Sequence, residues 1–317
     1  MKILLLVSLL LGLNVSVQAG SVVRFGHFPN VTHVQALVAH HLSRQGKGWF
    51  EERLGPGVSI EWYIYNAGPS AMEGIFADSI DVTYVGPSPA INAYAKSNRA
   101  EVRIVAGSAN GGAALVIQPD SGIKTGADFR GKRIATPQLG NTQDVACRAW
   151  LRAQGLKITQ MGGDAQVLPT PNPDQLSLFT LKKLDAVWTV EPWVSRLERE
   201  AGGKVFLEEK DSVTTVLVTS VKFQKEQAEL LRKLTSAHRE LTQWIKDHPQ
   251  EAQAMVVAEL SAETRSKISP DLIAAAWKRI ELTHEVSMES LKTFVTNAQK
   301  AGFLKAVPSL DALVLKP

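Results

Sequence analysis

Short runs of apolar and β-branched residues alternate with segments of helical periodicity from the start of this 317-residue chain to about residue 219. The runs have the length of strands, and most are followed by room for one helix. This alternation is typical of α/β folds with largely parallel sheets. The predicted strands are residues 22–26, 59–65, 81–85, 102–106, 113–117, 133–135, 165–168, 185–189 and 213–219.

One strand–helix unit occurs twice. Residues 80–87 (IDVTYVGP) are echoed by residues 184–192 (LDAVWTVEP), where a strand pattern again ends in a proline-marked helix start. A repeat at a spacing of roughly 100 residues predicts two lobes of similar build that face each other. The alternative is that short strand–helix junctions resemble one another by chance.

Two segments are expected to connect the lobes. Residues 107–112 (GSANGG) are rich in small residues, which give the backbone the freedom of a hinge. The return connection is placed near residues 210–214, and residues 223–304 read mostly as helices. The predicted organisation is a signal peptide (1–19), a first lobe (20–107 and 214–317) and a second lobe (108–213).

The first residues have the layout of a secretory signal peptide. Lys2 precedes an apolar run at residues 3–13 and a small-residue end at Ala19, which predicts export to the periplasm and cleavage after about Ala19. A membrane anchor is the alternative, but the run is shorter than the roughly 20 residues that span a bilayer. No cysteine lies at the junction, and the sole Cys147 has no partner for an intramolecular disulfide.

Charge and motifs argue against several classes of function. The chain has 35 Lys and Arg against 31 Asp and Glu, and its basic residues are spread out, so no nucleic-acid surface is predicted. The sequence contains no Gly-x-Gly-x-x-Gly motif after a strand, no phosphate-binding loop and no Gly-x-Ser-x-Gly elbow. Cys147 falls within a helical pattern, which favours a buried structural thiol. Nucleotide-binding and hydrolase functions therefore lose their usual support, and together with the predicted export signal this argues against an enzyme.

The seven histidines raise the question of a metal site. The densest group is His27, His33, His40 and His41, in which His33 and His40 could share a helix face. Their spacing fits no standard cluster and no acidic residue lies among them, so neither a metal nor another cofactor is expected.

Polar and small residues gather at predicted helix starts. Unpaired N–H groups and the helix dipole favour negative charge there. Several converging helix termini could together approach the binding free energy of a micromolar complex, which is roughly 8 kcal/mol. Each residue alone is explained as readily as an ordinary helix cap. The residues chosen on this ground are Asn30, Thr32, His33, Gly86, Ser88, Ser108, Gly112, Gln138, Asn141 and Thr142.

Five nearby side chains each have two interpretations. Tyr65, Tyr84, Trp188 and Trp193 could line an apolar flank for an organic tail, although Trp188 fits a strand core equally well. Glu191 starts a helix, where it could complement the dipole or face the cleft and pair with a cationic group of the ligand.

Five motifs between about residues 22 and 219 are specific enough to suggest a family. They are residues 26–33 (GHFPNVTH), 66–69 (NAGP), 81–92 (DVTYVGPSPAIN), 131–144 (GKRIATPQLGNTQD) and 191–193 (EPW). Together they resemble the periplasmic binding proteins of ABC importers for aliphatic sulfonates, nitrate and taurine.

The resemblance implies an α/β, two-lobed periplasmic binding protein of type II, with a hinge of two crossover segments that closes around the ligand. The residues that match the family's binding positions are the helix starts 30–33 and 86–88, the turn at Ser108 and the segment 136–142 with Thr136, followed by the weaker candidates Glu191, Thr214 and Thr215.

The implied ligand is a small anion, first an aliphatic sulfonate, with nitrate or taurine as alternatives. The implied protein partner is an ABC transporter permease in the inner membrane, and a monomer is expected. An enzyme on the same scaffold, of the type that makes a thiamine pyrimidine precursor, and an exported sensor domain are the competing hypotheses, because fold alone does not decide function.

Overall fold

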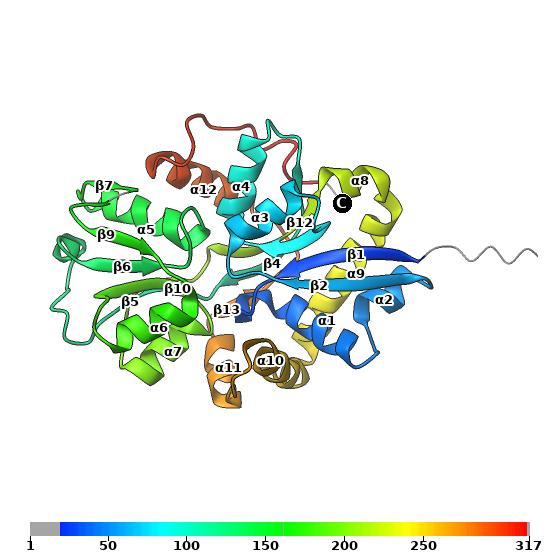
Figure 1. Ribbon diagram of the computed structural model, residues 1–317, viewed down its shortest axis with the longest axis horizontal. Coiled ribbons are helices and arrows are strands. Elements are labelled where there is room, and N and C mark those ends of the chain that lie inside the picture. The colour runs from blue at the N-terminus through cyan, green and yellow to red at the C-terminus, as the bar shows by residue number, and fades with distance from the viewer. Residues whose placement is uncertain (1–19, 161, 316–317) are drawn as a thin grey trace, which may run out of the picture.

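The computed structural model describes residues 20–160 and 162–315, so the predicted signal peptide and its cleavage site lie outside the described residues. The described chain forms two lobes, each with a central sheet and helices on both of its faces (Figure 1). Among the described residues, no helix is both long and apolar enough to cross a membrane.

The first lobe is built on a six-stranded sheet. β1 runs parallel to β2 and β3, whereas β12 pairs antiparallel with β3 and β4. The strand order is β13 (Ile280–Leu282), β4 (Val102–Gly111), β12 (Val213–Ser220), β3 (Val82–Val85), β1 (Ser21–His27) and β2 (Val58–Ile64). Its N-terminal helices are η1 (Val31–His33), α1 (Val34–Arg44), α2 (Trp49–Leu54), α3 (Gly68–Phe76) and α4 (Pro87–Lys96).

The second lobe is built on a five-stranded sheet. β6 runs parallel to β9 and β10, and β5 pairs antiparallel with β10 and β11. The strand order is β11 (Lys204–Glu209), β5 (Ala113–Ile117), β10 (Ala186–Val190), β6 (Arg133–Thr136) and β9 (Gln166–Pro169). The other elements are η2 (Gly126–Phe129), α5 (Thr142–Ala153), α6 (Asn172–Thr180), α7 (Trp193–Ala201) and the small pair β7 (Ile158–Thr159) and β8 (Gly162–Gly163).

The expectation of largely parallel sheets is therefore corrected to two mixed sheets. In each lobe, successive strands that are joined by a helix run parallel to each other. The strands that follow the changes between sheets, β5 and β12, run in the opposite direction and pair antiparallel with their neighbours. β11 and β13 were not predicted, because β11 is only partly buried and β13 has three residues.

The chain changes sheet between β4 and β5 and again between β11 and β12. Gly111 ends β4 and Gly112 follows it in the first of these connections, with φ of 70° and 72°. A Cβ on Gly111 would come 2.5 Å from Arg279 O and 2.8 Å from Lys210 O, so a larger residue would press on both neighbouring segments. Both positions have the positive φ that glycine adopts readily.

β4 is longer than the predicted strand at residues 102–106. Ser108 lies inside this strand rather than in a turn, because residues 107–111 continue the pairing with β12 and with β13. Small residues suit this position, since a Cβ on Gly107 would collide with the carbonyl of Glu285.

The repeated unit identified in the sequence has the same geometry in both lobes. Asp81 precedes β3 and accepts hydrogen bonds from the backbone N and Nε of Arg24, at 2.8 and 3.1 Å. Asp185 precedes β10 and accepts the same two bonds from Arg133, at 2.8 and 3.0 Å. The resemblance between the two segments therefore reflects equivalent structural roles.

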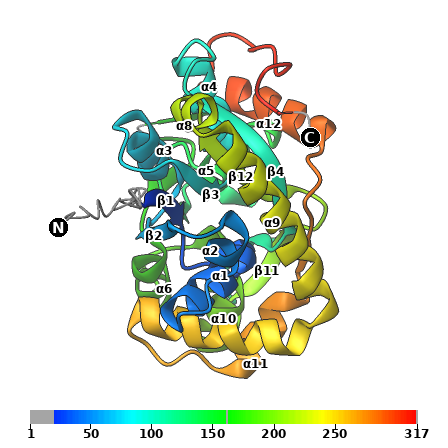
Figure 2. The same ribbon diagram turned by 90° about the vertical axis from the view of Figure 1, so that its right-hand side faces the viewer.

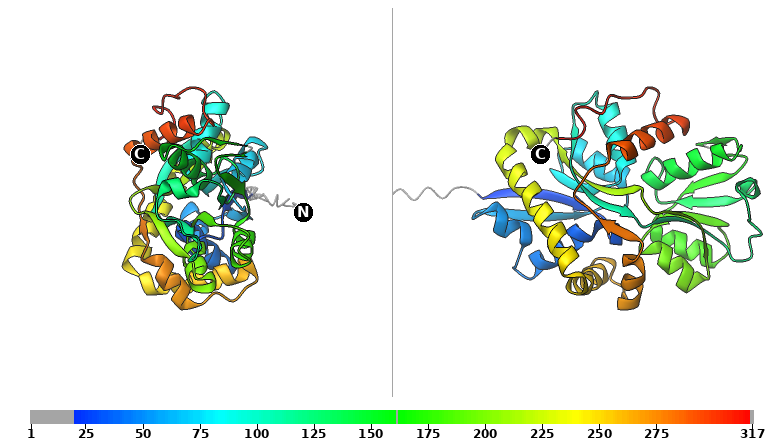
Figure 3. Two further views of the ribbon diagram at one scale, coloured as in Figure 1. Left: turned by 90° about the vertical axis from the view of Figure 1, so that its left-hand side faces the viewer. Right: turned by 180° about the vertical axis from the view of Figure 1, so that it is seen from behind.

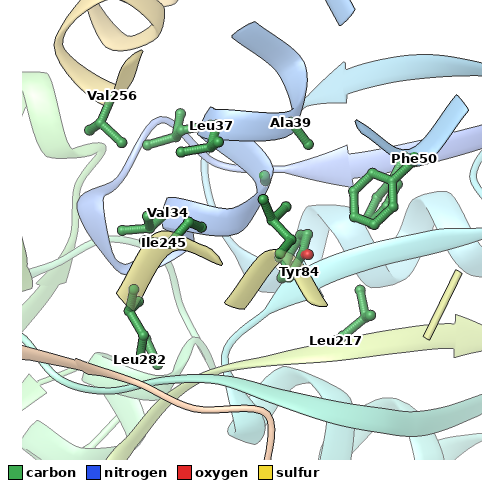
Figure 4. Close-up of a cluster of buried hydrophobic side chains, with 14 of the residues drawn as sticks. Val34, Leu37, Ala39, Phe50, Tyr84, Leu217, Ile245, Val256 and Leu282 are labelled. Atoms are coloured by element: carbon green, nitrogen blue, oxygen red, sulfur yellow. The ribbon is translucent and has the colours of Figure 1, made fainter. Parts of the chain in front are cut away.

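Apolar side chains pack on both faces of each sheet. In the largest cluster, Tyr84 and Leu217 from the first sheet face Leu37 of α1 and Phe50 of α2 (Figure 4). Ile245 of α9 (Ala228–Asp247) completes this layer. These side chains are fully buried, and burial of each contributes about 1.5–3 kcal/mol.

Residues after β12 form helices, as predicted, and connect the two lobes. They are α8 (Val221–Glu226), α9 (Ala228–Asp247), α10 (Pro249–Thr264), α11 (Pro270–Trp277) and α12 (Met288–Lys300). α9, α10 and α11 wrap around one side of the first lobe (Figure 2). α11 packs against α7, while α12 contacts both α4 and α5 (Figure 3).

Candidate functional site

A small cavity of about 30 Å³ lies between the carboxyl ends of the two sheets. This is room for roughly two water molecules, so the cleft is nearly closed in this conformation. The residues that line it are Phe28, Asn30, Thr32, His33, Asn66, Ala67, Gly68, Gly86, Pro89, Pro137, Asn141, Thr142, Gln143, Asn172, Val190 and Thr214.

Helices α3, α4 and α5 begin at this cavity, as does α6 at Asn172. Gly68 starts α3, Gly86 immediately precedes α4, and Thr142 starts α5. α3 and α4 belong to the first lobe and α5 to the second, so the positive ends of their dipoles face one space from both sides. Such an arrangement favours an anion, which accepts hydrogen bonds from the free N–H groups of a helix start.

Gly86 allows the close approach of the two lobes. A Cβ on Gly86 would collide with Thr142 Oγ1, and the N–H of Ser88 donates to that oxygen at 3.4 Å. The Thr142 hydroxyl therefore lies directly at the start of α4.

Asp144 holds the loop that carries Asn141 and Thr142. Its carboxylate accepts hydrogen bonds from Thr136 Oγ1 at 2.9 Å, from Gly140 N at 2.9 Å and from Arg148 Nε at 3.0 Å. Asp144 and Arg148 are almost completely buried, and their ion pair compensates the charge of both side chains. Asn141 in turn caps α5 by accepting from the N–H of Asp144 at 2.8 Å.

His33 contributes a neutral ring to the lining. Burial lowers the pKa of His33 well below its usual range. Its Nδ1 accepts from the N–H of Phe28 at 3.4 Å, which leaves Nε2 as the N–H donor of the ring. No lysine or arginine lies among the described residues of the lining, so the positive groups that face the cavity are helix dipoles and neutral hydrogen-bond donors.

Seven of the fourteen residues predicted from the sequence line the cavity, namely Asn30, Thr32, His33, Gly86, Asn141, Thr142 and the weaker candidate Thr214. Asn30 also joins the lobes, because its Oδ1 accepts from Trp193 Nε1 at 3.1 Å. The N–H of Val31 donates to Glu191 O at 2.9 Å, which is a second contact between the lobes.

The other seven predicted residues lie outside the lining, among them Gly112, which lies between β4 and β5. Ser108 bonds to Gln35, Thr136 to Asp144, and Gln138 to Ser70 across the lobes. Glu191 accepts from Ser195 N and Oγ and pairs with Arg279, so it stabilises the start of α7. Burial raises its pKa, while these partners lower it. Ser88 Oγ and Thr215 Oγ1 are buried and have no hydrogen-bond partner among the described residues.

None of the four aromatic residues proposed as an apolar flank, Tyr65, Tyr84, Trp188 and Trp193, belongs to the described lining. Tyr84 donates to His238 in the core, Trp188 bonds to Glu209 and Trp193 to Asn30, so these rings serve packing and contacts between lobes. The apolar part of the lining comes instead from Phe28, Pro89, Pro137 and Val190.

Sequence reasoning missed the contributions of Asn66, Gln143 and Asn172. Asn66 lies in the NAGP motif two residues before α3, and Asn172 is the first residue of α6 and precedes Pro173. The signal that identified the other helix starts, a polar or small residue beside a helical pattern, also occurs at these two positions. Gln143 follows Thr142 within α5 and carries no such signal.

Comparisons with known proteins agree on one fold. The sequence model of a family described as the NMT1-like family matches residues 19–262. A putative aliphatic sulfonates-binding protein of Bacillus subtilis is 26% identical over 227 residues, which are 69% of this chain and 66% of that protein. The match to the other curated relatives spans about half of their length.

Two solved structures have the same architecture. The alkanesulfonate-binding protein from Xanthomonas axonopodis pv. citri, bound to MOPS, superimposes with a TM-score of 0.73 at 17% identity over 94% of this chain and 99% of that one. The periplasmic nitrate-binding protein from Synechocystis superimposes with a TM-score of 0.70 at 15% identity, over 92% of this chain and 84% of that one. At these identities the similarity establishes the fold, that of two-lobed periplasmic binding proteins.

Proposed function

This chain belongs to the NMT1-like family and has the fold of periplasmic binding proteins, and from that premise we propose that it is an extracytoplasmic solute-binding protein of an ABC importer. In this proposal the cleft binds a small oxyanion between the lobes, and hinge closure presents the complex to a permease in the inner membrane. The observation that carries the proposal is the meeting of three helix starts, at Gly68, Gly86 and Thr142, in one cavity.

The charge balance of the cleft favours a monoanion. Each helix start carries a partial charge of roughly +0.5, and neutral amide, hydroxyl and imidazole groups complete the lining. A sulfonate or a nitrate carries one negative charge, which these dipoles can balance. A dianion such as sulfate would remain under-compensated without a lysine or arginine.

An aliphatic sulfonate is the first choice for this monoanion. Three sulfonate oxygens can each accept from a different helix start, and relatives of this chain are named for sulfonates. Nitrate and taurine are the alternatives, of which nitrate is supported by the name of a structural neighbour. Because the closed cavity is small, a sulfonate with a long tail requires further opening of the lobes.

The proposed lobes comprise residues 20–107 with 214–317 and residues 108–213. In this proposal the chain passes between the lobes at Gly112 and at residues 210–212, and these two segments bend during closure. The changes of sheet between β4 and β5 and between β11 and β12 support it. The proposed location is the periplasm after removal of residues 1–19, and the proposed state is a monomer.

Isothermal titration calorimetry of the purified mature protein tests this function. The panel comprises methanesulfonate, ethanesulfonate, taurine, nitrate and sulfate, and we expect a 1:1 complex with an alkanesulfonate in the micromolar range or tighter. Thr142→Ala should weaken that complex by about tenfold or more, whereas Thr293→Ala, on the exposed side of α12, should leave it unchanged. Absence of binding to all five anions would contradict the proposal.

A further inference from the structure

Two histidines and a glutamate from distant parts of the chain converge inside the first lobe. They are His27 at the end of β1, His40 in α1 and Glu263 in α10. None of the three belongs to the lining of the anion cavity. The side chains of His27 and Glu263 are fully buried, and that of His40 is 9% exposed.

The three ligand atoms form a compact triangle. His27 Nε2 lies 3.2 Å from His40 Nδ1, and Glu263 Oε1 lies 3.1 Å from the first nitrogen and 3.0 Å from the second. Zinc–ligand bonds of 2.0–2.1 Å in a tetrahedral site separate the donor atoms by about 3.3 Å. The triangle is thus slightly tighter than the face of a zinc tetrahedron.

Hydrogen bonds do not satisfy this triangle while the carboxylate is ionised. If both nitrogens carry protons, the two N–H groups face each other, and if one lacks its proton, that lone pair faces the carboxylate oxygen. One of the three contacts is therefore unfavourable in either arrangement. A metal ion removes the conflict because it accepts a lone pair from each of the three atoms.

A second carboxylate lies beside the triangle. Glu259 is one helical turn before Glu263 on α10, and its Oε1 is 3.0 Å from His40 Nδ1 and 2.8 Å from Arg44 Nε. Both carboxylates are buried, and the Oε2 atoms of both have no hydrogen-bond partner among the described residues. Two buried carboxylates are costly unless cations compensate them, and Arg44 contacts only Glu259.

We propose that His27, His40 and Glu263 bind one divalent transition-metal ion, with Zn²⁺ as the best fit and Glu259 as the fourth ligand. Two imidazole nitrogens favour Zn²⁺ and its neighbours over Ca²⁺ or Mg²⁺, which prefer oxygen ligands. Around this site, Trp62 stacks on the His40 ring at 5.0 Å, and His27 Nδ1 faces Phe28 O at 3.4 Å.

The ion would fasten three elements that are far apart in sequence. It would join β1 and α1 to α10, in addition to the packing that already holds α1 against α10. His27 immediately precedes the segment that carries Phe28 and Asn30 to the anion cavity, so the site would also anchor one wall of the cleft. Its role in this proposal is structural.

Zinc titration of the chelator-treated, dialysed protein tests the proposal. We expect calorimetry to give one Zn²⁺ per chain with a Kd below about 1 µM, and the melting temperature to rise by about 5 °C in excess Zn²⁺. Glu263→Gln and His40→Gln should each weaken binding by at least about 100-fold. His248→Gln, an exposed histidine elsewhere, and His33→Gln, in the anion cleft, are the matched controls and should bind as the wild type does.

A spectroscopic measurement on the wild type covers the case in which the ligand variants fail to fold. Electron paramagnetic resonance of the Cu²⁺-loaded protein should show hyperfine coupling from two imidazole nitrogens. The proposal is overturned by the absence of a 1:1 complex, by unchanged Zn²⁺ affinity in both ligand variants, by loss of binding in His33→Gln, or by an oxygen-only Cu²⁺ spectrum.

Discussion

The hydroxyl of Thr142, at the start of α5, accepts a hydrogen bond from the backbone N–H of Ser88, in the first turn of α4, at 3.4 Å. This contact joins the two lobes at the point where their helix dipoles meet. It also satisfies one of the N–H groups that a helix start leaves free. The same N–H would be available to an anion after a small movement of Thr142, so in the proposed function closure and ligand binding involve the same groups.

Gly86→Ala tests whether closure depends on this close approach. The added Cβ would collide with Thr142 Oγ1, so the lobes could not reach the conformation described here. We expect anion affinity to fall by about tenfold or more in calorimetry while the melting temperature of the empty protein stays nearly constant. In the double variant Gly86→Ala/Thr142→Ala, the loss of anion-binding free energy should be smaller than the sum of the losses in the two single variants. Simple additivity would show that the two positions act independently.

Arg279 is expected to stabilise the contact between the lobes. Its guanidinium pairs with Glu191 at 3.0 Å and with Glu198 at 2.9 Å, both in the second lobe, whereas Arg279 itself follows α11. Arg279→Gln would leave the buried Glu191 carboxylate without its cation, which should lower the free energy of unfolding by about 2–3 kcal/mol in urea titrations.

The matched control is Arg232→Gln on α9. Arg232 pairs with Glu229, but both side chains are largely exposed. Arg232→Gln should therefore lower the free energy of unfolding by no more than about 0.5 kcal/mol. Equal effects of the two substitutions would rule out a special role for Arg279.

His238 should make the protein less stable at acidic pH. Its Nε2–H donates to Gly107 O and its Nδ1 accepts from the Tyr84 hydroxyl, both at 2.8 Å, and burial lowers the pKa of His238 to about 4. Between the unfolded pKa of about 6.5 and the folded value, the unfolded chain binds a proton that the native chain does not. The free energy of unfolding should therefore fall as the pH drops from 6.5 to 4, by up to about 3 kcal/mol.

Urea titrations at several pH values measure this loss. His238→Gln removes the titrating ring while its side-chain amide can still donate to Gly107, so its stability should depend less steeply on pH. Parallel curves for the two proteins would assign the acid sensitivity to other groups.

Most of the fold follows from local sequence signals. The strand at residues 113–117 was predicted with the bounds that the structure has, and the repeat of Asp81 and Asp185 indicated the equivalence of the lobes. Strand direction did not follow, because antiparallel pairing depends on where the chain returns after each crossover. The continuation of β4 through Ser108 also depends on a partner, β13, that lies about 170 residues away.

The site was predictable where a residue acts through its place at a helix start. Gly86, Asn141 and Thr142 line the cavity for that reason. Thr136 and Gln138 have equally suitable side chains, but their hydrogen bonds go to Asp144 and Ser70. Tertiary packing decides which hydrogen-bond partner such a side chain takes, and the sequence pattern alone does not show that choice.

The group of His27, His40 and Glu263 is a case in which the sequence pattern hides a contact that the fold creates. His27 and His40 have no acidic residue near them in sequence, which argued against a metal site. Glu263 reaches them only because α10 packs against α1, more than 200 residues along the chain.

Crystallography of the complex with 2-bromoethanesulfonate is the most direct test of an anion held at three helix starts. Anomalous scattering from bromine locates the ligand independently of the protein model. We predict a sulfonate group in the cavity between Gly68, Gly86 and Thr142, with its oxygens about 2.7–3.2 Å from backbone or side-chain donors of both lobes. A ligand found outside this cavity, or one that contacts only a single lobe, would contradict the account.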